Sequence, residues 1–164
     1  MLHILTGDGK GKTSAAVGMA VRMSGYGKKV LFAQFLKGSD SGEIVILKQL
    51  PNIQVLRLSG DYGFLPNMTD SEISAVRAEH NEILRTAAQG GYDLIVLDEV
   101  IPAMNYGLLD HELLNPILSA DCELVLTGRD PQAFLLEKAD YVSEIKKIKH
   151  PYDKGVQARK GVEF

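Results

Sequence analysis

A glycine- and lysine-rich segment near the amino terminus has the residue types that hold phosphate. It reads Thr6-Gly7-Asp8-Gly9-Lys10-Gly11-Lys12-Thr13-Ser14. Glycines let the backbone turn its N–H groups inward, Lys12 adds a full positive charge, and the Thr13 hydroxyl can reach Mg²⁺. The loop is a variant, because Thr6 stands where the first glycine is usual. Lys10 is either a second phosphate contact or a solvated charge. The pattern favours nucleotide phosphate binding over an empty glycine turn, by Gly7, Asp8, Gly9, Lys10, Gly11, Lys12, Thr13 and Ser14.

Two carboxylates and one arginine follow apolar runs and are candidates for the same site. Asp98 and Glu99 come directly after the run Leu-Ile-Val-Leu, and Arg129 follows the next apolar run. In nucleotide-binding α/β folds, an acid at the end of a buried strand faces the phosphate loop and holds Mg²⁺, directly or through water. Thr13, Asp98 and Glu99 are therefore the candidate metal ligands, with the choice between the two acids open. The alternatives are that the acids cap a following helix and that Arg129 forms a structural ion pair.

Short apolar runs alternate with segments of helical period, which is the pattern of βα units in a parallel sheet. Strands are expected at 2–5, 30–35, 53–58, 94–97, 123–126 and 141–148. Helices are expected at 12–24, 42–50, 69–89, 111–118 and 130–138. The loop at 59–68 and the tail at 149–164 are expected to be irregular. The order predicts an α/β fold, a single P-loop NTPase-like (RecA-like) domain with a mostly parallel sheet and helices on both faces.

Length, charge and cysteine content narrow the class of protein. With 164 residues and 45% hydrophobic content, the chain is long enough for one α/β core, so a single domain over 1–164 is expected. Lys and Arg number 18 against 21 Asp and Glu, which gives no electrostatic reason to expect nucleic acid as a partner. The only cysteine, Cys122, cannot form an internal disulfide. No apolar run is long enough to span a bilayer and no signal-peptide pattern opens the chain, so we expect a cytoplasmic protein.

Four further segments, together with the variant loop, resemble the P-loop-type ATP:cob(I)alamin or cob(I)yrinic acid a,c-diamide (corrinoid) adenosyltransferases. They are Gln-Phe-Leu-Lys-Gly at 34–38, Leu-Asp-Glu at 97–99, Leu-Thr-Gly-Arg at 126–129, and the tail from 149 to 164. The resemblance implies that a corrinoid cobalt, reduced to Co(I), attacks C5′ of ATP and that tripolyphosphate leaves. It also implies that the triphosphate lies in the loop in the reverse sense to an ordinary ATPase.

The resemblance implies a role for each candidate residue. Lys12, the loop amides and Mg²⁺ would stabilise the charge that builds on the departing triphosphate, so no general base is needed. The candidate catalytic residues are Lys12, Glu99 and Arg129. Tyr62 and Phe64 are the candidate aromatic cover for the corrinoid, with ordinary loop packing as the alternative. His150 joins them as a tail anchor or nucleotide contact, because a histidine on cobalt would oppose the chemistry.

The implied partners are ATP, a corrinoid (cobalamin, cobinamide or cobyrinic acid diamide), an electron-donating reductase and a second copy of the chain in a homodimer. Many family members carry an amino-terminal segment that can cover the active site, whereas the printed chain begins at the first strand. There is also no tryptophan. Two other functions are compatible with the loop: a RecA-like ATP hydrolase or nucleotide-driven switch in which Glu99 activates water, and a non-enzymatic nucleotide or corrinoid carrier.

Overall fold

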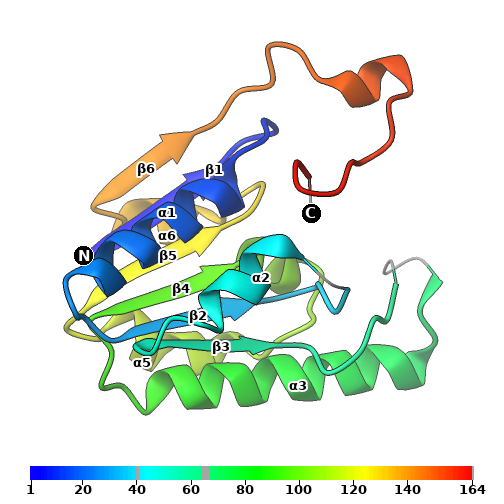
Figure 1. Cartoon of the computed structure of the whole chain (residues 1–164). Helices are drawn as coiled ribbons and strands as arrows, with labels where there is room; N and C mark the ends of the chain where they lie inside the picture. Colours follow the sequence, from blue (N-terminus) through cyan, green and yellow to red (C-terminus); the bar gives the residue numbers. More distant parts are fainter. Residues whose placement is uncertain (40, 64–66, 164) are drawn as a thin grey trace.

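The structure, a computed structural model, describes residues 1–39, 41–63 and 67–163. Over these ranges one sheet contains β1 (Leu2–Thr6), β2 (Val30–Gln34), β3 (Ile53–Arg57), β4 (Leu94–Asp98), β5 (Glu123–Thr127) and β6 (Tyr141–Glu144). The strand order is β3-β2-β4-β5-β1-β6, and all of these pairings are parallel (Figure 1). All residues of β2 and β4 are buried, as continuous apolar runs predict. The predicted α/β class is confirmed.

Helices cover both faces of the sheet. On one face lie α1 (Lys12–Gly25) and α2 (Gly42–Leu47), and on the other lie α3 (Asp70–Ala88), α4 (Val100–Asn105), α5 (Asn115–Leu118) and α6 (Ala133–Lys138) (Figure 1). Successive side chains of a strand point to opposite faces, so β2 contributes to two cores. Val30 and Phe32 belong to the core under α1 and α2. Leu31 and Ala33 belong to the core under α3 and α4.

The carboxyl ends of three neighbouring strands, β4, β5 and β1, meet at one edge of the sheet. There β1 leads into the phosphate loop, β4 ends at Asp98 and β5 ends at Thr127. Ligands of parallel α/β sheets bind beyond this edge. The fold therefore gathers the loop, the acidic pair and Thr127 from segments that are far apart in the sequence.

Two predicted boundaries are wrong for local reasons. The last strand ends at Glu144 rather than at 148, and Ile145 bonds instead to the backbone of the phosphate loop. The helix expected from 130 begins at Ala133, because Asp130 has a positive φ of 54° and the N-cap residue, Gln132, is extended. In the first case the contact with the loop ends the strand early, and in the second the extended turn delays the start of the helix.

Three other helical segments differ from the expectation. α4 was not predicted, because its six residues follow β4 almost directly and contain Pro102, so they look like a continuation of the apolar run. The helix expected at 111–118 consists of a 3-10 turn, η2 (His111–Leu114), followed by α5. α2 stops at Leu47 rather than at 50.

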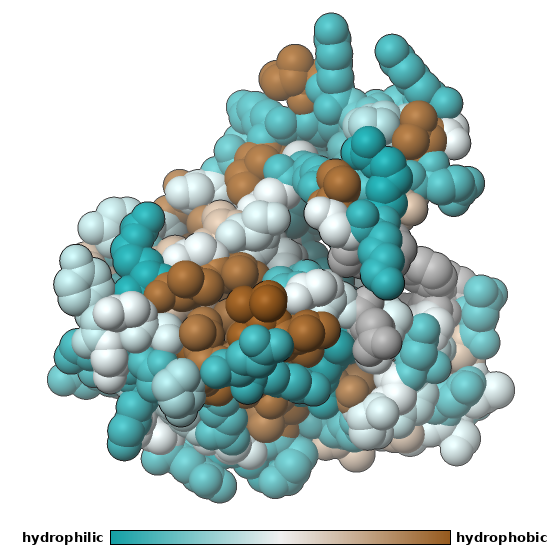
Figure 2. Space-filling view, in the orientation of Figure 1, coloured by the Kyte–Doolittle hydropathy of each residue, from teal (hydrophilic) through white to brown (hydrophobic). Residues whose placement is uncertain are grey.

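After β6 the chain crosses the carboxyl edge of the sheet as a tail. The tail is irregular, as predicted, apart from a 3-10 turn, η3 (Pro151–Lys154), and its end returns towards the phosphate loop (Figure 1). Figure 2 shows apolar side chains gathered in the middle of the same view, and Val45 and Ile46 on α2 are among the exposed apolar residues. Within the described ranges, none of the helices combines the length and apolar character needed to cross a bilayer.

Candidate active site

The phosphate loop connects β1 to α1 and is pressed against the segment that follows β6. Gly7 and Gly11 have positive φ angles of 98° and 125°, a region that favours glycine. A Cβ on Gly7 would lie 2.4 Å from the carbonyl oxygen of Ile145, and one on Gly9 would lie 2.7 Å from it. The Gly9 N–H donates to that oxygen over 2.7 Å. The glycines are therefore required by the contact with Ile145 as well as by the curvature of the loop.

Asp8 and Arg129 lie at the outer rim of the loop. Asp8 Oδ1 accepts the Lys147 N–H over 3.0 Å, and this hydrogen bond is the main cause that lowers the pKa of Asp8. The exposed Arg129 donates from Nη2 to the Asp8 carbonyl over 3.4 Å. Among the described residues, Arg129 makes no ion pair. The alternative that Arg129 forms a structural ion pair is therefore not supported within the described ranges.

The two lysines of the loop have different surroundings. Lys12 is 8% exposed, and its Nζ donates to the carbonyl oxygens of Gly7 over 2.7 Å and Gly9 over 3.0 Å. Burial is the main cause that lowers the pKa of Lys12. A phosphate bound nearby would oppose this effect, because its negative charge stabilises the charged form of the lysine. The exposed Lys10 donates to the carbonyl oxygen of Val162 in the tail. Lys12 is held within the loop, whereas Lys10 links the loop to the tail.

Asp98 has a fully buried carboxylate at the end of β4. It accepts hydrogen bonds from Thr13 Oγ1 at 3.0 and 3.2 Å, Thr127 Oγ1 at 2.8 Å and Gln34 Nε2 at 3.2 Å. Lys37 Nζ lies 3.7 Å from Asp98 Oδ2. A buried carboxylate needs such partners, because desolvating an unpaired charge costs several kcal/mol (about 3 to 5 when one partner of a pair is removed). The partners come from three separate segments, at the start of α1, at the end of β2 and at the end of β5, so only the folded chain assembles them.

Glu99 differs from Asp98 in both backbone and surroundings. It has a left-handed φ of 58°, its N–H donates to Thr127 Oγ1 over 2.8 Å, and its side chain makes no capping hydrogen bond with α4. Gly128 lets α4 approach, because a Cβ there would lie 2.3 Å from Pro102 Cδ. Burial, followed by the neighbouring Asp98, raises the pKa of Glu99. The acids therefore do not cap the next helix through their side chains: Asp98 faces the loop, and Glu99 lines the adjacent cavity.

The donor set at the loop fits Mg²⁺. Thr13 and Asp98 place a hydroxyl and a carboxylate side by side, and Mg²⁺ commonly takes one or two carboxylates, with water and phosphate oxygens completing the shell. Gln34 Oε1 is buried beside Asp98 and has no hydrogen-bond donor in the described part of the chain. This oxygen could accept a hydrogen bond from a water molecule bound to the ion. The described ranges hold no group of three or more His, Cys, Asp or Glu side chains that could cage a metal. The residues therefore suit a partly hydrated ion.

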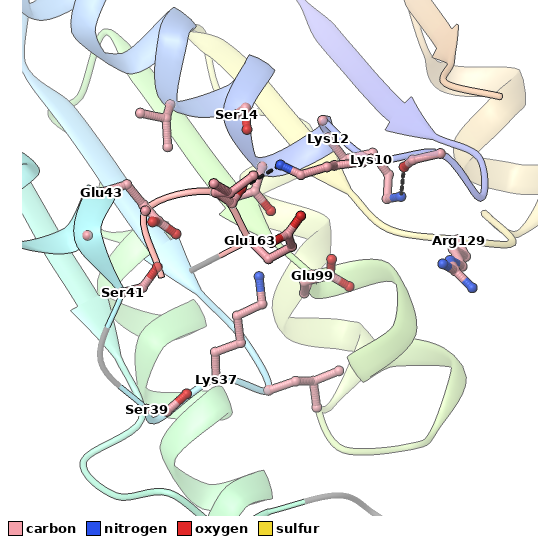
Figure 3. Close-up of a pocket in the computed structure, with 18 of the residues that line it drawn as sticks. Lys10, Lys12, Ser14, Lys37, Ser39, Ser41, Glu43, Glu99, Arg129 and Glu163 are labelled. Carbon is pink, nitrogen blue, oxygen red and sulfur yellow. Dashed lines mark hydrogen bonds between the residues drawn. The ribbon is translucent and has the colours of Figure 1, made fainter. Parts of the chain in front are cut away.

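A cavity of about 860 Å³ lies in front of these residues. It is lined by 8–14, Val17, 36–39, 41–43, Asp61, Gly63, Glu99 and Arg129, and by the tail residues His150 and 161–163. Figure 3 shows Lys37 rising into this cavity from the side opposite Lys10 and Lys12, with Glu163 between them. Glu163 also accepts hydrogen bonds from Arg159 within the tail. Positive side chains therefore face the cavity from two sides.

Sequence reasoning did not assign Lys37 or the end of the tail to the site. Lys37 had a signal, because it follows a buried strand and precedes Gly38. Gly38 approaches Gly60 so closely that a Cβ would lie 1.7 Å from the Gly60 carbonyl oxygen. Val162 and Glu163 had no local signal, because their place depends on the path of the tail.

The three candidate corrinoid contacts have different outcomes. Tyr62 donates its hydroxyl to Glu79 over 2.6 Å, packs beside a small apolar cluster and does not line the cavity, which matches ordinary loop packing. Phe64 lies outside the described residues. His150 lines the cavity, and its Nδ1 accepts the Tyr152 N–H over 3.2 Å at the start of η3, as a tail anchor would.

A search of solved structures finds a likeness of fold. A KaiC-like protein from the archaeon Pyrococcus horikoshii superposes with a TM-score of 0.51 at 13% identity, covering 88% of this chain and 72% of that one. At this identity the likeness concerns the fold alone.

Sequence comparison identifies closer relatives. The family model described as ATP:corrinoid adenosyltransferase BtuR/CobO/CobP matches residues 1–164. A corrinoid adenosyltransferase of Pseudomonas aeruginosa is 36% identical, covering 100% of this chain and 83% of that protein. One from Escherichia coli is 33% identical and CobA of Salmonella typhimurium is 32% identical, each covering 100% of this chain and 85% of that protein. Because both the family model and these relatives span the whole chain, the protein belongs to the ATP:corrinoid adenosyltransferase family.

Proposed function

We propose that this protein transfers the 5′-deoxyadenosyl group of ATP to the Co(I) of a corrinoid and releases tripolyphosphate. The observation that carries the proposal is the family match over residues 1–164. The cavity supports it, because the phosphate loop forms one wall and Lys37 and Arg129 add positive charge around it. The loop and these two cations suit a substrate that carries a triphosphate.

In the proposed step an electron pair on Co(I) forms the bond to C5′ of ATP. The bond between C5′ and O5′ breaks, and its electron pair leaves on the oxygen of tripolyphosphate. Cobalt is formally oxidised from Co(I) to Co(III), so an electron donor must supply the Co(I) state before each turnover. Because no proton is transferred at the reacting carbon, the task of the protein is to position the groups and stabilise charge.

The phosphate loop and its cations would stabilise the leaving group. Lys12 and the other loop residues at 8–14 line the cavity in which the triphosphate would lie, and Arg129 lies at the rim where charge can spread. Lys12 already bonds two carbonyl oxygens of the loop, so its ammonium group is oriented before ATP arrives. This preorganisation lowers the cost of stabilising charge as it develops.

Thr13 and Asp98 would hold Mg²⁺, with Glu99 beside them. The ion would neutralise part of the triphosphate charge and so make tripolyphosphate a better leaving group. Asp98 is the stronger candidate of the two acids, since its carboxylate already meets the Thr13 hydroxyl. Glu99 lines the cavity and is the candidate for a contact with substrate or with metal-bound water.

The corrinoid would occupy the part of the cavity lined by Asp61, Gly63 and the tail residue His150. Phe64 lies outside the described residues and stays a sequence-based candidate for an aromatic cover. We further infer a cobalamin, cobinamide or cobyrinic acid diamide as substrate, a reductase as electron donor, a homodimer and a cytoplasmic location. The family match supports a corrinoid as the substrate, whereas the reductase and the homodimer rest on the resemblance alone and the location rests on the sequence pattern and the lone cysteine.

One incubation tests the reaction. The protein is mixed with ATP, Mg²⁺, a corrinoid and a strong reductant, and the products are separated by chromatography. Adenosylated corrinoid and tripolyphosphate in equal amounts are expected. ADP and phosphate formed without dependence on corrinoid would instead indicate a RecA-like hydrolase, and binding of both substrates without any product would indicate a carrier.

A further inference from the structure

His80 is a buried polar side chain of α3 that the proposed reaction leaves without a role. It is completely buried, and its ring lies 4.8 Å from that of Phe35. Nε2 accepts the Leu36 N–H over 3.2 Å, and Nδ1 lies 2.9 Å from the carbonyl oxygen of Leu108. Because a backbone N–H only donates and a carbonyl only accepts, these contacts require the neutral ring with its hydrogen on Nδ1. Burial is the main cause that lowers the pKa of His80, which favours the same form.

The Leu36 N–H belongs to a strained turn. Leu36 has a φ of 61°, in the left-handed region that a residue with a side chain adopts only when its surroundings hold it there. Arg57 donates to the carbonyl oxygen of Lys37 over 3.2 Å, and Gly38 packs against Gly60. His80 bonds the strained residue itself, and the other contacts hold the chain just after it.

The turn directs the next side chain, Lys37, into the cavity. Its Nζ lies 3.7 Å from Asp98 Oδ2, and the side chain is 40% exposed although the Asp98 carboxylate is fully buried. Lys37 therefore faces both the buried acid and the open space. Figure 3 shows Lys37 reaching into the cavity from the side opposite Lys10 and Lys12. A change in the backbone angles of Leu36 would turn Lys37 away from this position.

We propose that Lys37 contacts the triphosphate from the side opposite the phosphate loop and that His80 is its positioning residue, acting through Leu36. The inference rests on the proposed function in so far as the ligand is a nucleotide triphosphate. Neutral His80 holds the left-handed turn, the turn aims Lys37, and Lys37 supplies the positive charge. A histidine that only filled space in the core would affect stability and leave phosphate affinity unchanged.

The test measures the Kd of tripolyphosphate in excess Mg²⁺ by calorimetry on the full chain, with the Tm of each variant. Lys37→Met keeps the apolar stem and removes the charge, and it should weaken binding about tenfold, the size of one lost charge-assisted hydrogen bond. His80→Leu removes both ring hydrogen bonds and should weaken binding by a similar factor. The double variant should bind no more weakly than Lys37→Met, because both changes remove the same contact.

Two further variants separate positioning from stability. His80→Gln can still accept from Leu36 and donate to Leu108, so it should recover most of the affinity. Leu84→Ala, in the fully buried core one turn further along α3, should lower the Tm and leave the Kd unchanged. Additive losses in the double variant, or a wild-type Kd in folded His80→Leu, would overturn the proposal. If His80→Leu does not fold, Lys37→Met decides: an unchanged Kd refutes the proposal and a tenfold loss supports it.

The assay also keeps this inference apart from the proposed function, because tripolyphosphate binding needs no corrinoid. The proposed reaction alone would be refuted if tripolyphosphate binding depends on Lys37 and His80 as expected but the wild-type protein forms no adenosylated corrinoid. Normal turnover with a Kd indifferent to both residues would refute the inference alone.

Discussion

The two walls of the cavity are held by different kinds of contact. On the sheet wall, Asp98 is fixed by buried hydrogen bonds with Thr13 and Thr127, and the loop backbone bonds to Ile145. The tail wall, over 149–163, has exposed contacts: Lys10 links it to the loop through the Val162 carbonyl oxygen, and two ion pairs lie within the segment after β6, Lys147 with Asp153 at 3.0 Å and Arg159 with Glu163 at 3.2 Å. Water screens exposed pairs, whereas a broken buried network leaves polar groups desolvated.

This difference assigns different tasks to the two walls. The sheet wall is a preformed site for charge, since its groups are positioned without ligand. The tail wall can be displaced at little energetic cost, which suits a cavity that must admit a nucleotide and a large second substrate. Changes on the sheet wall should therefore have larger effects than changes on the tail wall.

The largest effect is expected for Lys12→Ala. Its charge acts on the leaving triphosphate, so turnover should fall about 100- to 1,000-fold, as when one preorganised stabilising contact is lost. Its hydrogen bonds are to loop carbonyls rather than to the core, so the Tm should change by less than about 3 °C. The measurement is the rate of adenosylated corrinoid formation. Lys10→Ala is the matched change in the same loop and should cost less; full activity of Lys12→Ala would remove the assigned role.

A large effect on stability is expected for Thr127→Val. The Thr127 hydroxyl donates to Asp98 and accepts the Glu99 N–H, so its loss leaves the Glu99 N–H without its acceptor and takes one of three hydrogen-bonding side chains from the buried Asp98. The free energy of unfolding in urea should fall by about 2 kcal/mol. Thr127→Ser keeps the hydroxyl and should lose less than about half of that. Equal stability of the Val and Ser variants would show that the bridge contributes nothing.

A smaller, pH-dependent effect is expected for Glu99→Gln. Burial raises the pKa of Glu99 in the folded state, so the folded protein binds this proton more tightly than the unfolded chain. Stability is then lost as the pH rises through the folded-state pKa. Glu99→Gln should have a higher Tm than wild type at about pH 8, with the gap closing towards about pH 4, near the unfolded-state pKa. The exposed Glu82→Gln is the control, and a lower Tm of Glu99→Gln at pH 8 would contradict the expectation.

The smallest effect is expected on the tail wall, for Arg159→Ala. It removes the exposed pair with Glu163, so the Tm should change by less than about 2 °C and the KM for ATP by less than about threefold. Melting curves and steady-state kinetics provide the comparison with Lys12→Ala. A loss of activity as large as that of Lys12→Ala would mean that the tail is part of the charge site.

Most regular elements and the phosphate loop could be predicted, because their signals are local. The apolar runs predicted five strands closely, and Thr69 with Glu72 forms the capping box that begins α3. α4 was missed because its residues continue the apolar run of β4. The early end of β6 was missed because Ile145 is taken up by a partner far away in the sequence.

The amino-acid sequence by itself determined the parallel α/β class, the glycine and lysine pattern of the loop, and the family. These depend on backbone geometry and side-chain periodicity over neighbouring residues. Only the tertiary structure decided that Asp98 rather than Glu99 meets Thr13, that Lys37 faces the cavity, and that the tail returns to the loop. These contacts join segments that become neighbours only when the sheet brings their strands together, and no short stretch of sequence encodes that order.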